Sequence, residues 1–199
     1  MQYIFMALFA TVVVIADQLS KSWVVNNIAS SVCNANVADC QLHMQTLQKL
    51  YGVTAAEMSA LPKTVEGIPG IFQLSHVHNT GAAFSSFEGQ RWLFAIIFAL
   101  FTAAIIWEFS KKRMGFSTFE RWCIVAVFAG GLGNMIDRFR LGFVVDMIDL
   151  EFTQLPWLAW LNRFAVFNVA DCFITCGCVA LIVSLVFFNK TFWKDSKKK

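Results

Sequence analysis

Long apolar stretches alternate with polar connections along this chain of 199 residues. A helix rises about 1.5 Å per residue, so about 20 apolar residues are needed to cross a hydrocarbon layer of about 30 Å. Four stretches reach or approach that length, at approximately residues 3–25, 91–109, 121–138 and 165–188. The pattern predicts an all-α integral membrane protein with four transmembrane helices.

The first stretch is apolar from Tyr3 to Ala16 and must continue through Asp17 to about Val25 in order to span. A cleavable signal peptide is the alternative interpretation. Such a peptide has basic residues before its apolar run and a small-residue cleavage site after it. This stretch has neither feature, so we expect it to be a transmembrane helix.

A polar insert of approximately residues 27–70 separates the first two apolar stretches, and we expect it to lie outside the membrane. Apolar residues recur at helical spacing in residues 41–49 and 55–61, which predicts two short amphipathic helices. Residues 71–77 alternate between apolar and polar side chains, and Gly81 follows where a turn would need it. A small extended element is therefore predicted there.

The composition agrees with a membrane location. Hydrophobic residues make up 57% of the chain, charged residues make up 15%, and the mean hydropathy is +0.59, which is far from the soluble average. At this length we expect a single membrane domain, residues 1–199. The net charge is only +3, and its basic residues are not interleaved with base-stacking aromatic residues, so no nucleic-acid partner is expected.

The basic residues predict the orientation, because short basic connections stay in the cytoplasm. One basic group lies in residues 111–121, and the other is the C-terminal tail. Four spans then place both termini in the cytoplasm and the insert on the periplasmic side. Asp146 and Asp171 fall near that outer surface, and Asp17 and Lys21, late in the first stretch, reach the same level.

Acidic groups at membrane depth are costly and indicate a function. Two carboxylates that converge in a partly dry place repel each other when both are ionised, so such a pair holds one proton near neutral pH. The ionised member accepts a proton from an attacking water, and the protonated member polarises the peptide carbonyl and then protonates the leaving amine. This chemistry needs no metal, cofactor or covalent nucleophile.

Asp146 and Asp171 are candidates for a carboxylate pair of this kind. On spacing alone, an equally good alternative is that both are structural residues that cap helices or pair with Arg138, Arg140 or Arg163, because structural ion pairs perturb acids as well.

Five short motifs occur in one order along the chain: DQLSK (Asp17–Lys21), VHNTGAAFS (Val77–Ser85), GGLGNMIDR (Gly130–Arg138), GFVVDMID (Gly142–Asp149) and FNVAD (Phe167–Asp171). Together with the four predicted spans, this set resembles that of the bacterial lipoprotein signal peptidases, also called signal peptidase II. The resemblance runs from the first span to the last and leaves out residues 30–68 and the end of the chain.

The resemblance implies an aspartic endopeptidase of the bacterial inner membrane. Its substrate would be a diacylglyceryl-modified prolipoprotein, cut just before the lipidated cysteine, and we expect it to work as a monomer among membrane lipids. By motif, the catalytic pair would be Asp146 and Asp171, although the residues alone do not separate Asp146 from Asp149 or Asp137. The motifs also imply roles in holding the site or the substrate for Asn79, Gly81, Asn134, Asp137, Arg138 and Asn168.

Several of these positions have alternative interpretations. Asp137 stands directly before Arg138 at a helix end, which is typical of an ion pair with Arg138 or with Lys21. Asp17 and Lys21 are four positions apart on one helical face, in the order that favours a self-neutralised pair. The alternative for Asp17 and Lys21 is that they support the outer site.

Asn168 and Asp171 are three positions apart and share a helical face. The amide of Asn168 is therefore expected to orient the carboxyl group or the scissile carbonyl. Asn134, Asp137 and Arg138 form a similar facing set at the end of the third stretch.

Other reactive residue types form no recognisable site in the sequence. His76 and His78 alternate on one face of the expected strand, but no further ligand stands at metal-binding spacing, so a metal site is not expected. The serine pair at residues 85–86 has no general base near it in the sequence, so a serine mechanism is unsupported. Cys33 and Cys40 of the insert either form a disulfide in oxidising surroundings or stay free.

Two segments depart from the family pattern. The insert, over residues 30–68, is longer than usual, and the connection between the two acids contains a segment, residues 150–163, whose Trp157 and Trp160 suggest a position in the membrane interface. Two other function classes remain open: a small transporter or channel component that uses the acids as an ion path, and a scaffold whose insert recruits a partner.

Overall fold

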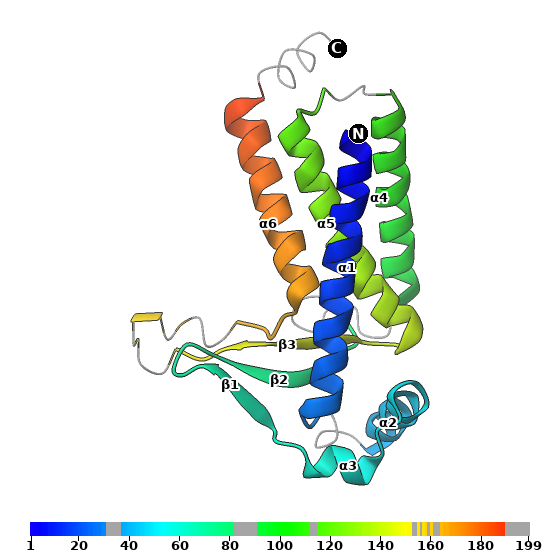
Figure 1. The fold of residues 1–199 in the computed structure, drawn as a ribbon, viewed down its shortest axis with the longest axis vertical. Helices are drawn as coiled ribbons and strands as arrows, with labels where there is room; N and C mark the ends of the chain where they lie inside the picture. Colours follow the sequence, from blue (N-terminus) through cyan, green and yellow to red (C-terminus); the bar gives the residue numbers. More distant parts are fainter. Residues whose placement is uncertain are drawn as a thin grey trace. The chain divides into compact units, whose positions relative to one another are not determined.

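A computed structural model describes residues 1–30, 37–81, 91–111, 115–152, 155, 157–158, 160 and 164–189. The fold is mostly helical and includes one small sheet (Figure 1). Its elements in chain order are α1 (Gln2–Asn27), α2 (Val37–Tyr51), α3 (Ala55–Ala60), β1 (Thr64–Ile68), β2 (Phe72–Asn79), α4 (Arg91–Lys111), α5 (Thr118–Arg140), β3 (Val144–Leu150), α6 (Val169–Val183) and the π-helical turn η4 (Ser184–Phe188).

The chain divides into two compact units by its internal contacts. Unit 1 consists of Met1–Asp17, Trp92–Asn134 and Val169–Lys199, and unit 2 consists of Gln18–Arg91 and Met135–Asn168. Helices α1 and α5 therefore each contribute residues to both units. The single domain expected over residues 1–199 stays a prediction.

Three helices of the described chain are long and apolar enough to cross a membrane: Gln2–Asn27, Trp92–Ser110 and Val169–Phe188. They correspond to three of the four predicted spans. Helix α5 is not among them, and its uncharged stretch between Arg121 and Asp137 is 15 residues long. At about 1.5 Å per residue this stretch covers about 22 Å, which is less than the hydrocarbon thickness of about 30 Å.

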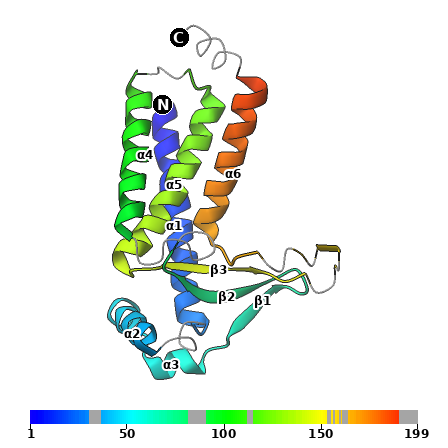
Figure 2. The ribbon, with the colours of Figure 1, turned by 180° about the vertical axis from the view of Figure 1, so that it is seen from behind.

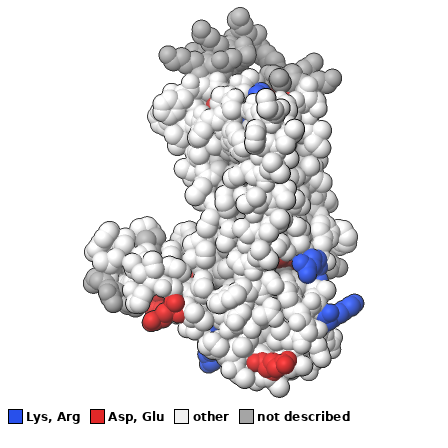
Figure 3. All heavy atoms as spheres, viewed as in Figure 1, with Lys and Arg blue, Asp and Glu red and all other residues white. Residues whose placement is uncertain are grey.

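Unit 1 is a bundle in which the first part of α1 runs beside α4, α5 and α6 (Figures 1 and 2). The ring of Phe9 contacts Trp122 and Phe173 with centroid distances of 5.5 and 6.0 Å, which joins α1 to α5 and α6. Many apolar side chains of these helices point outward, and the face shown in Figure 3 carries almost no charge over the bundle. Such a surface is suited to lipid.

Helices α5 and α6 approach each other closely at Gly130. A Cβ atom built on Gly130 would lie 2.4 Å from the carbonyl oxygen of Ala170 and 2.8 Å from Cγ1 of Ile174. A side chain at this position would therefore collide with α6. Small residues in this way allow membrane helices to pack backbone against backbone.

Unit 2 contains an antiparallel sheet in the order β1-β2-β3 (Figures 1 and 2). Strand β2 confirms the extended element predicted at residues 71–77. Strands β1 and β3 were not predicted, and Asp146, which was expected in a connection, lies within β3. The all-α prediction is therefore correct for the helices and misses most of the sheet.

The insert contributes to the hydrophobic core of unit 2. Its helices α2 and α3 confirm the two predicted short helices, and a reciprocal pair of hydrogen bonds between Thr54 and Glu57 caps α3. The buried apolar cluster takes residues from the end of α1, from the insert and from the chain around β3: Val24, Val25, Ile28, Met44, Leu47, Val53, Met58, Leu141, Phe143, Val145 and Met147. The insert is thus an integral part of this unit's packing.

Some predicted features fall outside the described residues. These are Cys33, the Cys40 side chain, the serines at 85–86, the basic residues 112–113, Arg163 and the C-terminal lysines. Within residues 150–163, the side chains of Trp157 and Trp160 are exposed. The interfacial position of that segment stays a prediction.

Candidate active site

Asp146 is a buried carboxylate that two asparagine amides hold within unit 2. Strand β3 pairs with β2 so that Asp146 lies opposite Val77, and Asn79 stands two positions further along β2. From that diagonal position, which is within side-chain reach, Asn79 Nδ2 donates to Asp146 Oδ2 at 2.9 Å. Asn168 Nδ2 donates to the other oxygen, Oδ1, at 2.7 Å. The side chain of Asp146 is 2% exposed.

Backbone bonds to β3 bring Asn168 to this carboxylate. Phe167 N donates to the carbonyl of Ile148 at 3.1 Å, and the carbonyl of Phe167 accepts from Met147 N and Ile148 N at 3.0 and 2.7 Å. The residue after Phe167 is therefore held at the level of Asp146. The first residue of the FNVAD motif, Phe167, is thus anchored to the sheet.

Asp171 lies in unit 1, in the first turn of α6. Asn134 of α5 donates through Nδ2 to its Oδ1 at 2.7 Å. Asp17 of α1 accepts at Oδ1 from Ala170 N at 3.0 Å and is itself fully buried. A carboxylate that accepts from an amide of a first helical turn stabilises the helix start. Asp17 thus holds the turn that carries Asp171.

Asp137 is the centre of a buried polar cluster in unit 2. Lys21 Nζ lies 2.9 Å from Oδ2, Gln18 Nε2 donates to Oδ1 at 2.9 Å, and Val145 N donates to Oδ2 at 3.3 Å. The pairing with Lys21 was one of the two expected, and it neutralises two charges that are almost fully buried. Val145 directly precedes Asp146, so this cluster contacts the backbone next to that carboxylate.

Arg138 and Gly81 are joined by a hydrogen bond in unit 2. Arg138 Nη2 donates to the carbonyl oxygen of Gly81 at 2.7 Å, and Gly81 N donates to Asn79 Oδ1 at 3.0 Å. The side chain of Asn79 is therefore fixed at both ends, by the Gly81 amide and by Asp146. Hydrogen bonds thus link Arg138 to Asp146 through Gly81 and Asn79.

The three histidines of the chain also meet in unit 2. His78 Nε2 lies 3.0 Å from His76 Nε2, and His78 Nδ1 lies 3.0 Å from His43 Nδ1. His76 and His78 were singled out as candidates from the sequence, whereas His43 was not. No group of three or more His, Cys, Asp or Glu among the described residues has an arrangement that could hold a metal ion.

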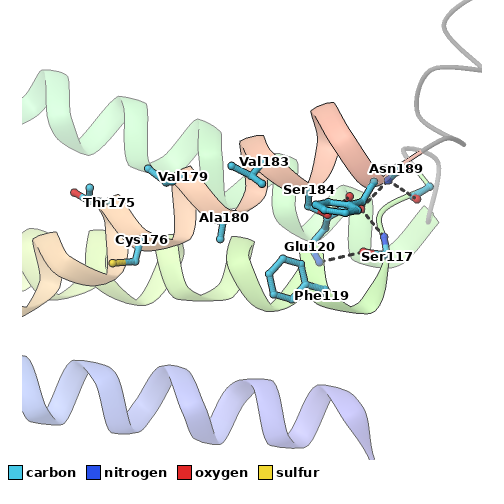
Figure 4. A pocket seen from close by; sticks show the side chains of 12 residues that line it. Ser117, Phe119, Glu120, Thr175, Cys176, Val179, Ala180, Val183, Ser184 and Asn189 are labelled. Carbon is cyan, nitrogen blue, oxygen red and sulfur yellow. Dashed lines mark hydrogen bonds between the residues drawn. The ribbon is translucent and has the colours of Figure 1, made fainter.

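Unit 1 contains an open cavity of about 1130 Å³ between α5 and α6 (Figure 4). At its polar end the Glu120 carboxylate accepts from Ser117 N and Asn189 Nδ2, each at 2.7 Å, and from the Ser184 hydroxyl at 2.9 Å. Glu120 is fully buried, and these bonds fasten the start of α5 to η4. The sequence signal for it was the Ser117-to-Glu120 spacing, which is typical of a helix cap.

The comparisons with known proteins agree on one family. The family model described as Signal peptidase (SPase) II matches residues 9–187. The chain belongs to the signal peptidase II family. It is therefore a membrane peptidase, of the aspartic class to which this family belongs.

Individual relatives are similar over most of their length. A lipoprotein signal peptidase of Streptococcus agalactiae serotype Ia is 36% identical over 152 residues, which are 76% of this chain and 86% of the relative. One of Streptococcus pyogenes serotype M5 is 31% identical over 179 residues, which are 90% of this chain and 86% of the relative. The family predicted from the five motifs is confirmed.

Solved structures show the same fold. A bacterial membrane enzyme determined by the in meso method at 1.9 Å resolution has a TM-score of 0.65 and 26% identity, and the match covers 93% of this chain and 94% of that one. A second such structure, at 2.3 Å resolution, has a TM-score of 0.64 and 26% identity, with 94% and 90% covered. Both matches extend over nine tenths or more of this chain.

Proposed function

We propose that this peptidase removes the signal peptide from diacylglyceryl-modified prolipoproteins by cleavage before the lipidated cysteine, with Asp146 and Asp171 as its catalytic dyad. The relatives are named lipoprotein signal peptidases, which supports the substrate class. The observation that carries the dyad is that an asparagine amide from another segment holds each of these two carboxylates.

The proposed mechanism uses one proton shared between the two acids. The ionised carboxylate accepts a proton from water as the water oxygen attacks the peptide carbonyl, and the protonated carboxyl polarises the carbonyl oxygen through a hydrogen bond. When the tetrahedral intermediate collapses, the carbonyl re-forms, the C–N bond breaks, the leaving amine takes the proton of the protonated carboxyl, and the dyad keeps the proton that came from water. The proton belongs to the dyad, and its assignment to one aspartate is a choice of microstate.

Neighbouring groups support this chemistry by fixing the carboxylates. Asn79 and Asn168 orient Asp146, and Asn134 orients Asp171. Positioned hydrogen bonds of this kind reduce the reorganisation that the reaction would otherwise require. Five further residues support the two carboxylates through hydrogen bonds and an ion pair: Asp17, Lys21, Asp137, Arg138 and Gly81.

The proposed arrangement in the membrane has four spans, with α5 as the fourth. Both termini then lie in the cytoplasm, and Asp146, Asp171 and the insert lie on the periplasmic side of the inner membrane. The charged ends of α5 would reach the interfaces, which explains its short uncharged stretch. Apolar faces of the spans would hold the diacylglyceryl group, and the enzyme would act as a monomer in lipid.

The test is cleavage of a synthetic diacylglyceryl prolipoprotein by the purified full-length protein. Asp146→Asn and Asp171→Asn should leave folding and membrane insertion intact and abolish cleavage. Asp149→Asn is the matched control, because Asp149 lies on the same strand and binds Gln73 Nε2 at 3.1 Å; this variant should retain activity. Turnover by either of the first two variants would remove that aspartate from the mechanism. The same peptide without its lipid should be cleaved poorly.

A further inference from the structure

All three histidines of the chain form one continuous line of contacts. His43 lies on α2 of the insert, and His76 and His78 lie on β2. His76 Nδ1 is 3.0 Å from the carbonyl oxygen of Ile28, which follows α1. The line therefore runs from the insert, across the strand, to the end of the first helix.

The carbonyl of Ile28 determines the direction of every hydrogen bond in this line. A carbonyl oxygen only accepts, so His76 Nδ1 carries a hydrogen, and in the neutral ring His76 Nε2 is then an acceptor. His78 Nε2 must donate to it. The remaining nitrogen of His78, Nδ1, is consequently an acceptor, and His43 Nδ1 donates to it. The bonds thus point from His43 through His78 and His76 to Ile28.

Burial keeps the two strand histidines neutral. Burial lowers the pKa of His76 to about 4, against the opposing effect of its bond to Ile28. The pKa of His78 is well below its usual value, because of burial and then of the nearby His76 and His43 rings. Phe143 stacks on His78 with a centroid distance of 3.9 Å. Neutral rings in fixed tautomers are therefore the state that this environment favours.

The line of histidines ends beside the amide that holds Asp146. His78 directly precedes Asn79, and in the sheet His78 lies opposite Val145, the residue before Asp146. Ser30 Oγ also lies 3.1 Å from His78 Nε2, where it can accept the same N–H in a bifurcated hydrogen bond. A displacement of His78 along the strand would consequently move Asn79 away from Asp146.

We propose that His43, His78 and His76 are positioning residues that form a directional hydrogen-bond chain, through which α2 of the insert holds Asn79 against Asp146. The inference rests on the proposed function, because it assigns the insert a role in the same site. The insert then has a part in positioning the site. Its helix α2 is fastened both by the apolar core and by one hydrogen bond to the strand that bears Asn79.

The first arm of the test determines the tautomers directly. Full-length protein labelled with ¹⁵N at histidine alone gives signals from three rings in detergent micelles. At neutral pH we expect hydrogen on Nδ1 of His43 and His76 and on Nε2 of His78. Three rings that titrate independently near their usual pKa, or any other tautomer pattern, would overturn the chain.

The second arm measures kcat and KM on the lipidated substrate. His43→Phe keeps a ring beside Phe143 but removes the donor, and should lower kcat about tenfold with little change in KM, since small misplacements near the reacting groups are costly. His43→Asn returns an N–H donor near the Nδ1 position and should recover most of that loss. Gln45→Ala, at an exposed position of α2, is the control and should match the wild type.

The two proposals fail in different ways. If the wild type did not cleave the substrate, or if Asp146→Asn did, the proposed function would be wrong. If the wild type cleaved and Asp146→Asn did not, while His43→Phe kept the full kcat, only the positioning role would be wrong. A purely structural role for His43 would lower the melting temperature of His43→Phe without the kcat loss or its recovery by His43→Asn.

Discussion

Asn168 donates to Asp146 at 2.7 Å, and Asp171 follows Asn168 by three positions in the chain. One short segment thus supplies the donor for one proposed catalytic acid and then the other acid itself. Its backbone is held by Ile148, next but one to Asp146 on β3. The segment's geometry, and not only its side chains, is therefore important to the site.

Removal of the Asn168 amide should slow catalysis without unfolding the protein. Asn168→Ala leaves Asp146 Oδ1 without this donor, and a hydrogen bond to a charged group is worth about 1.5–3 kcal/mol, so we expect kcat to fall about ten- to a hundredfold. The measurement is steady-state cleavage of the lipidated substrate. Asn27→Ala, at an exposed asparagine near the end of α1, should have no such effect, and equal losses in both variants would contradict the assignment.

Loss of Lys21 should destabilise unit 2. Lys21→Met leaves the Asp137 carboxylate buried without its cation, and the removal of one partner of a buried ion pair costs about 3–5 kcal/mol. The melting temperature in detergent should fall clearly, and the added substitution Asp137→Asn should recover part of the loss because the uncompensated charge is gone. Lys49→Met, at an exposed position, is the control. A Lys21→Met protein as stable as the wild type would show that the ion pair contributes nothing.

Two neighbouring glycines of α5 should respond differently to alanine. A Cβ at position 130 would meet the Ala170 backbone oxygen, which cannot move aside, whereas a Cβ at position 131 would lie 2.9 Å from the ring of Phe98, which can turn. Gly130→Ala should cost about 1–3 kcal/mol. Gly131→Ala should be much milder, because alanine gains about 1 kcal/mol of helix propensity. Thermal unfolding in detergent checks both, and the reverse order would contradict the close packing of α5 on α6.

Acid should destabilise unit 2 through its buried histidines. The pKa of His76 is about 4 in the folded chain and 6.5 as the ordinary value, so between these values the unfolded chain binds more protons. The free energy of unfolding is therefore highest above pH 6.5 and falls by about 1.4 kcal/mol per pH unit for each such histidine as the pH is lowered toward 4. His78 acts in the same direction. Melting curves from pH 7.5 to 5 would show this slope.

Two variants separate the histidine effect from that of the carboxylates. His76→Gln should flatten the slope between pH 6.5 and 5, at some cost in stability at neutral pH. Glu57→Gln should leave it unchanged, because the Thr54 hydrogen bonds lower the pKa of Glu57 below its ordinary value of 4.5, so its contribution is lost only at lower pH. An unaltered slope in His76→Gln would contradict the assignment.

Local patterns predicted the helices well. Of the two segments predicted as short helices, residues 41–49 lie within α2 and residues 55–61 overlap α3. The segment of alternating residues, 71–77, overlaps β2. The motifs placed the amides Asn79 and Asn168 among the site residues, and both bind Asp146. These features depend on neighbours within a few positions, which is the range in which periodicity is informative.

Features that depend on distant partners were not predicted. Strand β3 has acids at Asp146 and Asp149 that obscure its alternation, and it pairs with a strand more distant in the chain, so nothing local indicates it. His43 lies in a helical pattern that does not show its strand partners. Likewise, the sequence offered Arg138 and Lys21 equally as partners of Asp137, and only the folded chain shows the pairing with Lys21.

The composition of the unit 2 core also determines when it can form. Val24 enters early in synthesis, whereas Phe143 and Met147 become available only after α4 and α5 have been made. Until then the insert lacks the apolar partners against which Leu47 is buried, and contacts so distant in the chain close slowly. The order of synthesis therefore makes β3 the last strand of the sheet, so that Asp146 is made after both of the sheet's other strands.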